Sequence, residues 1–297
     1  MVCTHNRAGS LGRLLESLSR QALAADQFEV IVVDDGSSDQ TGSVCEAWQR
    51  KTPNLRYVRN GSTMGLAAAR NRGIAAASAD RIAFTDDDCI AHADWVGKMR
   101  DALEREPMVA GAVDTPTSNY FQLCHNIMQF SRFMPGQKEG VVRFAAGANM
   151  GCRRALLEQM GGFREVAPQV EDMEFAFRAA LQGYRPSLIP DAVVTHDPER
   201  RDLTAILRRA VEQGASSVLL RHRYRSLLRT PFVLRSAVLL FLGAPLIALK
   251  ATADTYVGRW RPPRWLATLP TVYLLKLAWC MGAARSLWKA DALKEGR

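Results

Sequence analysis

The chain has 297 residues, of which 47% are hydrophobic and 23% charged, and its net charge is +9. This balance is that of a globular protein, and it excludes a disordered chain, a collagen and a disulfide-stabilised miniprotein. Residues 1–197 carry 21 Lys and Arg against 24 Asp and Glu (net −3), whereas residues 198–297 carry 18 against 6 (net +12). We therefore expect a catalytic body followed by a basic region that attaches it to a partner.

The first 115 residues alternate between short apolar runs and helical patterns. Strands are predicted at residues 28–33, 55–58, 81–85 and 108–113, and helices near 10–23, 39–50, 65–77 and 92–105. Such alternation is typical of an α/β layer with a parallel sheet. Only Met1–Cys3 stand where a first strand is expected, so this strand is either clipped or begins upstream.

The middle of the chain is less regular. Residues 116–143 contain Pro116, Pro135 and Gly136, and we expect an irregular excursion over a site. Short helices are predicted at about 153–160 and 171–182, followed by two extended runs that Pro190 separates.

The C-terminal region combines basic and apolar segments. An amphipathic helix is predicted from residue 203, and apolar runs follow at 236–249 and 265–284. The first run would give about 21 Å of helix, less than the ~30 Å hydrocarbon core. A two-span hairpin would put the basic residues of 254–264, Arg259 among them, outside the cell, against the positive-inside rule.

We therefore predict in-plane or re-entrant helices on the cytoplasmic face of the cell membrane. The alternatives are membrane-spanning helices, a soluble helical subdomain and a dimer interface. No Cys-x-x-Cys motif and no signal peptide are present, which favours reduced thiols in the cytosol. No nucleic-acid-binding motif accompanies the basic charge, so a nucleic-acid partner is not expected.

Acidic residues directly follow two of the predicted strands. Asp34 and Asp35 follow Val30–Val33, and Asp86–Asp88 follow Ile82–Thr85. Ligands bind outside the carboxyl ends of parallel strands, and neighbouring carboxylates are stabilised by a cation. The pattern favours a Mg²⁺ or Mn²⁺ site that binds a diphosphate, and acidic helix caps are the alternative.

Three segments together resemble the inverting family 2 glycosyltransferases of the GT-A fold. They are Val33-Asp-Asp-Gly-Ser37, Gly65 with Ala69-Arg-Asn-Arg-Gly73, and Phe84-Thr-Asp-Asp-Asp88. The resemblance implies that Thr4 and Asp35 contact the nucleobase of a nucleotide-sugar, with Asp34 in the same pocket. Arg70 is expected at the same rim, and a helix-surface arginine is the alternative. The resemblance also implies that Asp86 lies near the ribose and that Asp88 holds the metal.

The acceptor side is expected from three further positions. Glu171-Asp172 resembles the family's Glu-Asp motif, which implies that Asp172 is the catalytic base. A neighbouring acid such as Glu171 would raise the pKa of that base, and acids that pair with the helix dipole in a first turn are the alternative. Asn149 lies in a segment that resembles the acceptor-side loop, and His196 follows a strand at a place where it could complete the metal shell. The Gln-x-x-Arg-Trp motif of processive members is absent, since Arg259-Trp260 lacks the upstream Gln.

The sequence thus predicts a GT-A catalytic domain at 1–197, with a donor half at about 1–115 and an acceptor half at about 116–197, and a helical region at 198–297. The expected activity is metal-dependent, inverting transfer of a single sugar, most commonly from a UDP-sugar, to a glycan, lipid-linked or small-molecule acceptor. One alternative is a sugar nucleotidyltransferase, whose Gly-rich loop is poorly matched by Thr4–Arg7. The other is a membrane-docked module that binds nucleotide-sugar without catalysis.

Overall fold

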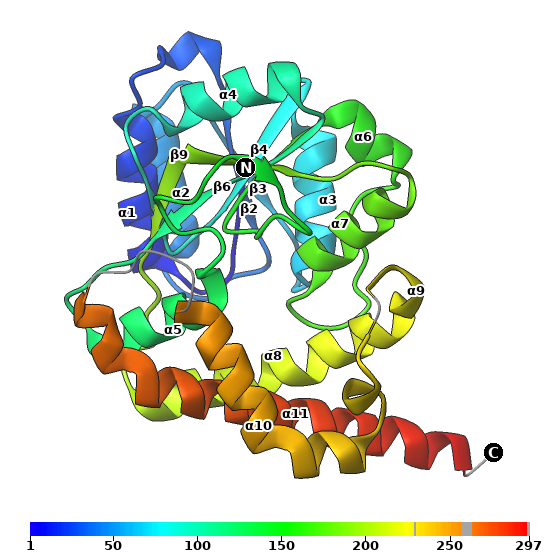
Figure 1. The fold of residues 1–297 in the computed structure, drawn as a ribbon. Helices are drawn as coiled ribbons and strands as arrows, with labels where there is room; N and C mark the ends of the chain where they lie inside the picture. Colours follow the sequence, from blue (N-terminus) through cyan, green and yellow to red (C-terminus); the bar gives the residue numbers. More distant parts are fainter. Residues whose placement is uncertain (229, 257–262, 296–297) are drawn as a thin grey trace. The chain divides into compact units, whose positions relative to one another are not determined.

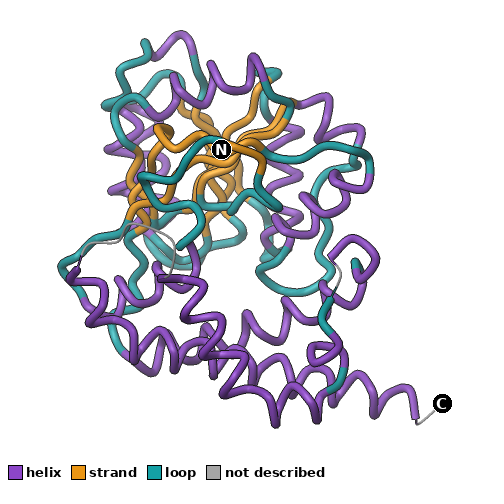
Figure 2. Tube along the Cα trace, in the orientation of Figure 1, coloured by secondary structure: helices purple, strands orange, loops and turns teal. Residues whose placement is uncertain are grey.

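The computed structural model describes residues 1–228, 230–256 and 263–295. They form two compact units. Unit 1 is Met1–Asp114, Arg132–Glu165 and Glu171–Pro198, and unit 2 is Thr115–Ser131, Val166–Val170 and Glu199–Arg297. Among the described residues, every strand belongs to unit 1 and unit 2 is helical (Figure 2). Arg259 and Trp260 lie outside the described residues, and the domain boundary at residue 197 stays a prediction.

Unit 1 is built on one sheet with the strand order β3-β2-β1-β4-β8-β6-β9-β5. The strands are β1 Val2–Thr4, β2 Val30–Asp34, β3 Leu55–Arg59, β4 Arg81–Asp86, β5 Cys89–Ala91, β6 Met108–Asp114, β7 Gly140–Val141, β8 Asn149–Arg153 and β9 Ser187–His196. β3, β2, β1 and β4 are parallel, as are β6 and β9, whereas β8 runs antiparallel to both β4 and β6. The expected mostly parallel sheet is confirmed.

Helices cover both faces of this sheet. α1 (Ala8–Ser19) and α2 (Thr41–Lys51) lie on one face, and α3 (Leu66–Ala76), α6 (Arg154–Gln159) and α7 (Glu171–Leu181) on the other (Figure 1). α4 (Trp95–Arg105) packs against β9, β6 and β8. In α1 the residues Leu11, Leu14, Leu15 and Leu18 are buried, which is the helical spacing that turns one apolar face to the core.

Two predictions of local structure were wrong. β9 is one strand, because Pro190 falls in a register shift where β6 passes from Gly111 to Ala112 while β9 passes from Ile189 to Val193. A bulge tolerates proline because the missing N–H leaves no ladder bond broken. Residues 120–130 form helix α5 (Tyr120–Phe130), whose first turn is capped by the side chain of Asn119.

Unit 2 is organised around helix α11 (Leu269–Glu295). It packs against α8 (Leu203–Arg223), α10 (Ala237–Tyr256) and α5, and the short helices α9 (Arg225–Leu228), η2 (Phe232–Arg235) and η3 (Pro263–Thr268) connect them. Lys276, which interrupts the apolar run of α11, donates to the carbonyl of Met128 on α5 at 3.2 Å. Protein therefore covers α11 on several sides.

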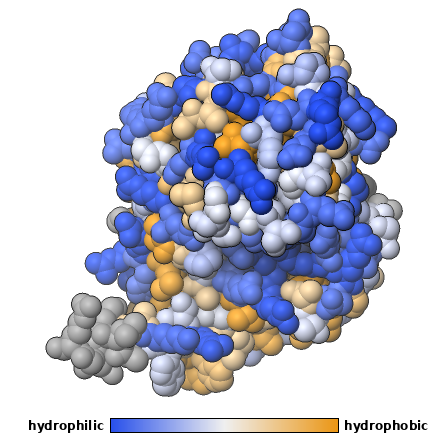
Figure 3. Space-filling model, turned by 180° about the vertical axis from the view of Figure 1, so that it is seen from behind, coloured by the Kyte–Doolittle hydropathy of each residue, from blue (hydrophilic) through white to orange (hydrophobic). Residues whose placement is uncertain are grey.

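Helix α10 has two apolar faces. Leu240, Ala244 and Ala248 are buried, the first two in a core that α10 shares with α8 and α11. The other face exposes Val238, Phe241, Leu242, Leu246 and Leu249, with 74% exposure at Leu246. Apolar residues of α10 thus reach the surface of unit 2, and α10 and α11 are both long and apolar enough to cross a membrane. Figure 3, seen from behind, shows other apolar residues among the hydrophilic surface.

Candidate functional site

The acidic motifs meet at one edge of the sheet. Thr4 of β1 is in register with Asp34 of β2, and Cys3 is in register with Asp86 of β4. The carboxyl ends of these three parallel strands therefore lie side by side, as expected. A cavity of about 270 Å³ lies at the opposite edge, lined by Val30, Ile31 and Ile82 among others, and is separate from the acidic residues.

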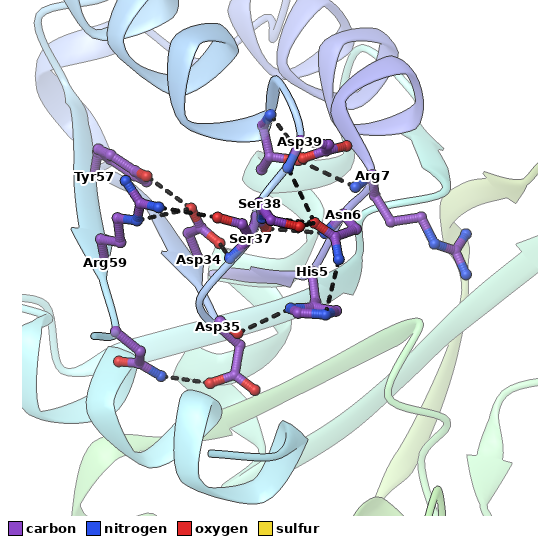
Figure 4. A network of polar contacts seen from close by, with 12 residues as sticks. His5, Asn6, Arg7, Asp34, Asp35, Ser37, Ser38, Asp39, Tyr57 and Arg59 are labelled. Carbon is purple, nitrogen blue, oxygen red and sulfur yellow. Dashed lines mark hydrogen bonds and ion pairs between the residues drawn. The ribbon is translucent and has the colours of Figure 1, made fainter. Parts of the chain in front are cut away.

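The turns after β1 and β2 are joined by hydrogen bonds (Figure 4). Asn6, with a left-handed φ of 53°, accepts from the backbone N–H groups of Ser38 at 2.8 Å and Asp39 at 3.2 Å. Its own N–H donates to the Ser37 hydroxyl at 2.9 Å. Asn tolerates this backbone conformation better than most residues, which explains its use at the crossing of two turns.

Asp34, predicted to lie in the donor pocket, is fully buried and bonded within the protein. Its carboxylate accepts from the Tyr57 hydroxyl and from the Ser37 N–H, each at 2.8 Å. The Arg59 guanidinium lies 3.8 Å away. Since buried carboxylates need such partners, Asp34 fixes the shape of the turn.

Asp35 connects the same rim to the loop after β3. Its carboxylate accepts from the Asn60 side chain at 2.6 Å and from the N–H groups of Met64 and Gly65, each at 2.9 Å. Gly65 has a φ of 92°, and the Glu165 carboxylate stands where a Cβ would lie. Glycine is therefore required where this loop enters α3.

Asp86, Asp88 and His196 form a group that could hold a metal ion. One potential ligand atom of each lies within 4.8 Å of the others. Two carboxylates and an imidazole fit Mn²⁺, and the carboxylates also suit Mg²⁺. His196 Nε2 lies 3.3 Å from Asp88 Oδ1, and Arg7 Nη1 lies 3.4 Å from Asp88 Oδ2.

Burial and mutual repulsion disturb the acids beside this group. Burial, and after it the Asp88 carboxylate, raise the pKa of Asp87 to about 7, while the hydrogen bond from the Thr4 hydroxyl at 2.7 Å opposes the rise. Burial also raises the pKa of Asp86, which Arg70 opposes. Both directions are those expected where several carboxylates share a small volume.

The predicted base lies in the first turn of α7. Asp172 is half-buried, and its carboxylate accepts from the Gly147 N–H at 2.7 Å. Burial, and after it the adjacent Glu171, raise the pKa of Asp172 to about 7, whereas Arg70 lowers it. A carboxylate with this pKa can exchange a proton near neutral pH.

Arg70 joins the acceptor-side acids to the metal group. The residue is 3% exposed, and its guanidinium lies 2.5 Å from Glu171 and 3.5 Å from Asp86. The predicted site residues Arg70, Asp86, Glu171 and Asp172 thus form one connected set within unit 1. Their individual roles remain predictions.

Asn149 lies apart from this set. It is fully buried, its amide donates to the carbonyls of Ala112 and Ala192 at 2.8 Å, and its oxygen accepts from Trp95 Nε1 at 2.8 Å. Every polar atom of the side chain is therefore used inside the sheet layer, and its acceptor-side role remains a prediction.

Three residues that contact the acids of the site were given no role from the sequence. Arg7 contacts Asp88, Tyr57 contacts Asp34, and Asn60 contacts Asp35. Arg7 lies in the segment that resembles the first turn of the family. Its place near the site could therefore be predicted from the sequence, but its contact with Asp88 could not. Tyr57 and Asn60 carried no signal, because only the folded chain brings the end of β3 beside Asp34 and Asp35.

Two family models match the chain. The model for Glycosyl transferase family 2 matches residues 1–161, and the model for Glycosyl transferase family group 2 matches residues 82–286. The Pre-mycofactocin glycosyltransferase of Mycobacterium tuberculosis (strain ATCC 25618 / H37Rv) is 27% identical over 98% of this chain, which spans 62% of that relative's length. Glycosyltransferase AglE of Haloferax volcanii is 24% identical, with 96% of this chain and 92% of that protein covered.

Solved structures are also similar. The mannosyltransferase PcManGT from Pyrobaculum calidifontis, in complex with GDP-Man and Mn²⁺, has a TM-score of 0.59 and 25% identity, covering 97% of this chain and 86% of that one. S. aureus TarS 1–349 in complex with UDP-GlcNAc has a TM-score of 0.57 and 18% identity, covering 100% of this chain and 91% of that one.

Proposed function

Because the chain belongs to glycosyl transferase family 2 and has the GT-A fold of these solved neighbours, we propose that it transfers a single sugar from a nucleotide-sugar, with inversion and with a divalent cation. The observation that supports this most is the connection, through Arg70, of a group able to hold a metal with the Glu171–Asp172 pair. Donor and acceptor chemistry would then meet at one edge of the sheet.

The donor half would bind the nucleotide. Thr4 and Asp35, with Asp34 in the same pocket, would lie at the nucleobase. A UDP-sugar is the first candidate, and GDP-mannose is the second because a similar enzyme was solved with it. Asp86, Asp88 and His196 would hold Mn²⁺ or Mg²⁺. The bound cation would offset the negative charge that develops on the departing diphosphate.

Asp172 would act as the base. The acceptor hydroxyl oxygen forms a bond to the anomeric carbon and passes its proton to the Asp172 carboxylate. The bond from that carbon to the diphosphate oxygen breaks, and its electron pair leaves with the nucleoside diphosphate. A single displacement of this kind inverts the configuration at the anomeric carbon.

The C-terminal helices would attach the enzyme to the cytoplasmic face of the cell membrane. The exposed apolar residues of α10 extend from Val238 to Leu249, a length of about 18 Å, which is less than the ~30 Å hydrocarbon core. The opposite face of α10 packs on α11, so a helix lying in the plane accounts for both faces. A glycan, a lipid-linked sugar or a small molecule would serve as acceptor.

The activity is tested by the products released. The protein is incubated with Mn²⁺ and UDP-glucose, UDP-N-acetylglucosamine or GDP-mannose, and free nucleoside diphosphate is measured. Its release supports glycosyl transfer, or transfer to water. Release of pyrophosphate from nucleoside triphosphate and sugar phosphate would indicate a nucleotidyltransferase instead. Binding without either product would indicate a non-catalytic module.

The metal group is tested by Asp88→Asn, which removes one charged oxygen ligand. We expect the variant to lose the Mn²⁺-dependent part of nucleoside diphosphate binding, measured by calorimetry with and without Mn²⁺. Asp101→Asn, on the exposed surface of α4, is the matched control and should bind as the unmodified protein does. Equal Mn²⁺ dependence in both variants would remove Asp88 from the metal role.

A further inference from the structure

Arg70 is a buried cation with partners from both halves of the site. On α3 it is almost fully shielded from solvent, with Nη1 2.5 Å from Glu171 Oε1 and Nη2 3.5 Å from Asp86 Oδ1. Its guanidinium also lies over the Phe163 ring, 5.3 Å from the centroid. A guanidinium held by two carboxylates and an aromatic face has little freedom to move.

Gly147 closes over this guanidinium. A Cβ at residue 147 would collide with Nη2 of Arg70, so only glycine leaves the room that the arginine occupies. The N–H of the same glycine donates to Asp172. Gly147 therefore leaves room for the arginine and at the same time donates a hydrogen bond to the candidate base.

The charges around Asp172 act in opposite directions. Glu171, adjacent on α7, is a like charge, whereas Arg70 on α3 is an opposite charge. Asp86 on β4 lies beyond Arg70, and Glu174, one turn along α7, is already paired with Arg178 at 2.9 Å. From the loop before β8, the Gly147 N–H stabilises the ionised form.

We infer that Arg70 is a positioning residue for the transfer reaction: it holds Glu171, the neighbour of Asp172, and supplies the positive charge that keeps Asp172 able to accept a proton. The inference rests on the proposed function, since it assigns Asp172 the acceptor proton. Arg70 itself touches carboxylates of the protein, and its effect on the reaction passes through them.

The test is the pH dependence of nucleoside diphosphate release. Arg70→Gln should move the acid limb of kcat to higher pH by about one unit or more, because a nearby positive charge is lost. Glu171→Gln should move it to lower pH, and the double variant should lie between them. If Arg70 and Glu171 mattered only for folding, their variants would have lower rates, but their acid limbs would not shift in opposite directions. Coincident acid limbs in all four proteins would overturn the inference.

Two further variants serve as controls. Arg81→Gln removes an arginine that pairs with Glu104 on the exposed surface, and it should leave the acid limb in place. Arg70→Lys keeps the charge but loses the planar fork, so it should keep the acid limb and lose rate. If Arg70→Gln does not fold, a displaced limb in Arg70→Lys would overturn the charge assignment.

A measurement without catalysis separates this inference from the proposed function. The pKa of Asp172 is about 7 when folded and about 3.9 when unfolded, so the folded state binds the proton more tightly. The free energy of unfolding, relative to Asp172→Asn, should fall as pH rises from about 4 to about 7 and then stay level. In Arg70→Gln the free energy of unfolding should continue to fall to higher pH. If the pH range of this fall is the same as in the unmodified protein, the inference is overturned. If that pH range is moved in Arg70→Gln but no donor gives a product, only the proposed function is refuted.

Discussion

At the scale of single residues, the acids of the site differ in burial. Asp34 and Asp35 are buried and accept hydrogen bonds from neighbouring loops, whereas Asp172 is half-buried, accepts backbone hydrogen bonds and has a pKa raised to about 7. The strand pattern of the sequence placed Asp34 and Asp35 at one sheet edge, whereas Asp172 was predicted only from the resemblance of Glu171-Asp172 to a family motif. The sequence could not tell which carboxylates meet Tyr57 or Asn60, because those partners come from a separate strand and loop.

Asp172→Asn should lower kcat by about 10²- to 10⁴-fold, because the amide cannot take the acceptor proton. The KM for the donor should change little, since the side chain is bonded to Gly147 and Met173 and its proposed role concerns the acceptor. Initial rates at pH 8 against donor concentration measure both constants. A kcat equal to that of the unmodified protein would remove Asp172 from the base role.

At the scale of elements, α8 and α11 cross at a pair of glycines. A Cβ on Gly214 of α8 would collide with the Trp279 carbonyl, and a Cβ on Gly282 of α11 would collide with the Val211 carbonyl. Each glycine thus lets one backbone approach the other. The periodicity of residues 203–218 predicted the helix, but the need for small residues became visible only when its partner was known.

Gly282→Ala should lower the free energy of unfolding by about 1–3 kcal/mol, since the two helices must separate to admit a methyl group. Chemical denaturation measured by circular dichroism gives this change. Gly243→Ala on α10 is the control, because its Cβ would meet Ile247 at an ordinary 3.4 Å. That variant should be neutral or up to about 1 kcal/mol more stable, through higher helix propensity. Equal effects at the two positions would contradict the close crossing.

The predictions of helices and strands failed where the local sequence and the packing of distant segments favour different structures. Pro190 looked like the end of a strand, yet a bulge in β9 accommodates it. The prolines around 116–136 suggested an irregular segment, and they hid the cap at Asn119 and the buried Leu123 and Ile127 of α5. The strands that carry the acidic motifs were predicted within a few residues, because buried apolar runs that end in polar turns are a strong signal.

At the scale of the whole molecule, the uneven charge and the apolar surface of unit 2 belong to the same part of the chain. Residues 198–297 carry a net charge of +12, and α10 exposes six large apolar side chains. Basic charge attracts anionic lipid, and exposed apolar residues insert at the interface. The composition predicted this combination, but which face of α10 is open could be learned only from its packing on α11.

Leu242→Glu combined with Leu246→Glu should reduce binding to vesicles of phosphatidylcholine and phosphatidylglycerol by more than tenfold. Both side chains are at least 70% exposed, and burying each would contribute about 1.5–3 kcal/mol. Co-sedimentation with vesicles measures the bound fraction. Val141→Glu, at a residue of unit 1 that is 66% exposed, should bind as the unmodified protein does. If the double variant binds vesicles normally but loses dimers, α10 is a contact between copies instead.

The hydrogen bonds that join the turns after β1, β2 and β3 have a consequence for nucleotide affinity. Asn6, Asp34 and Asp35 hold these turns together within the protein itself. Their conformational entropy is therefore lost during folding and not again when a nucleotide arrives. If the nucleotide binds at this rim, as proposed, such preorganisation would leave most of the contact energy available for affinity.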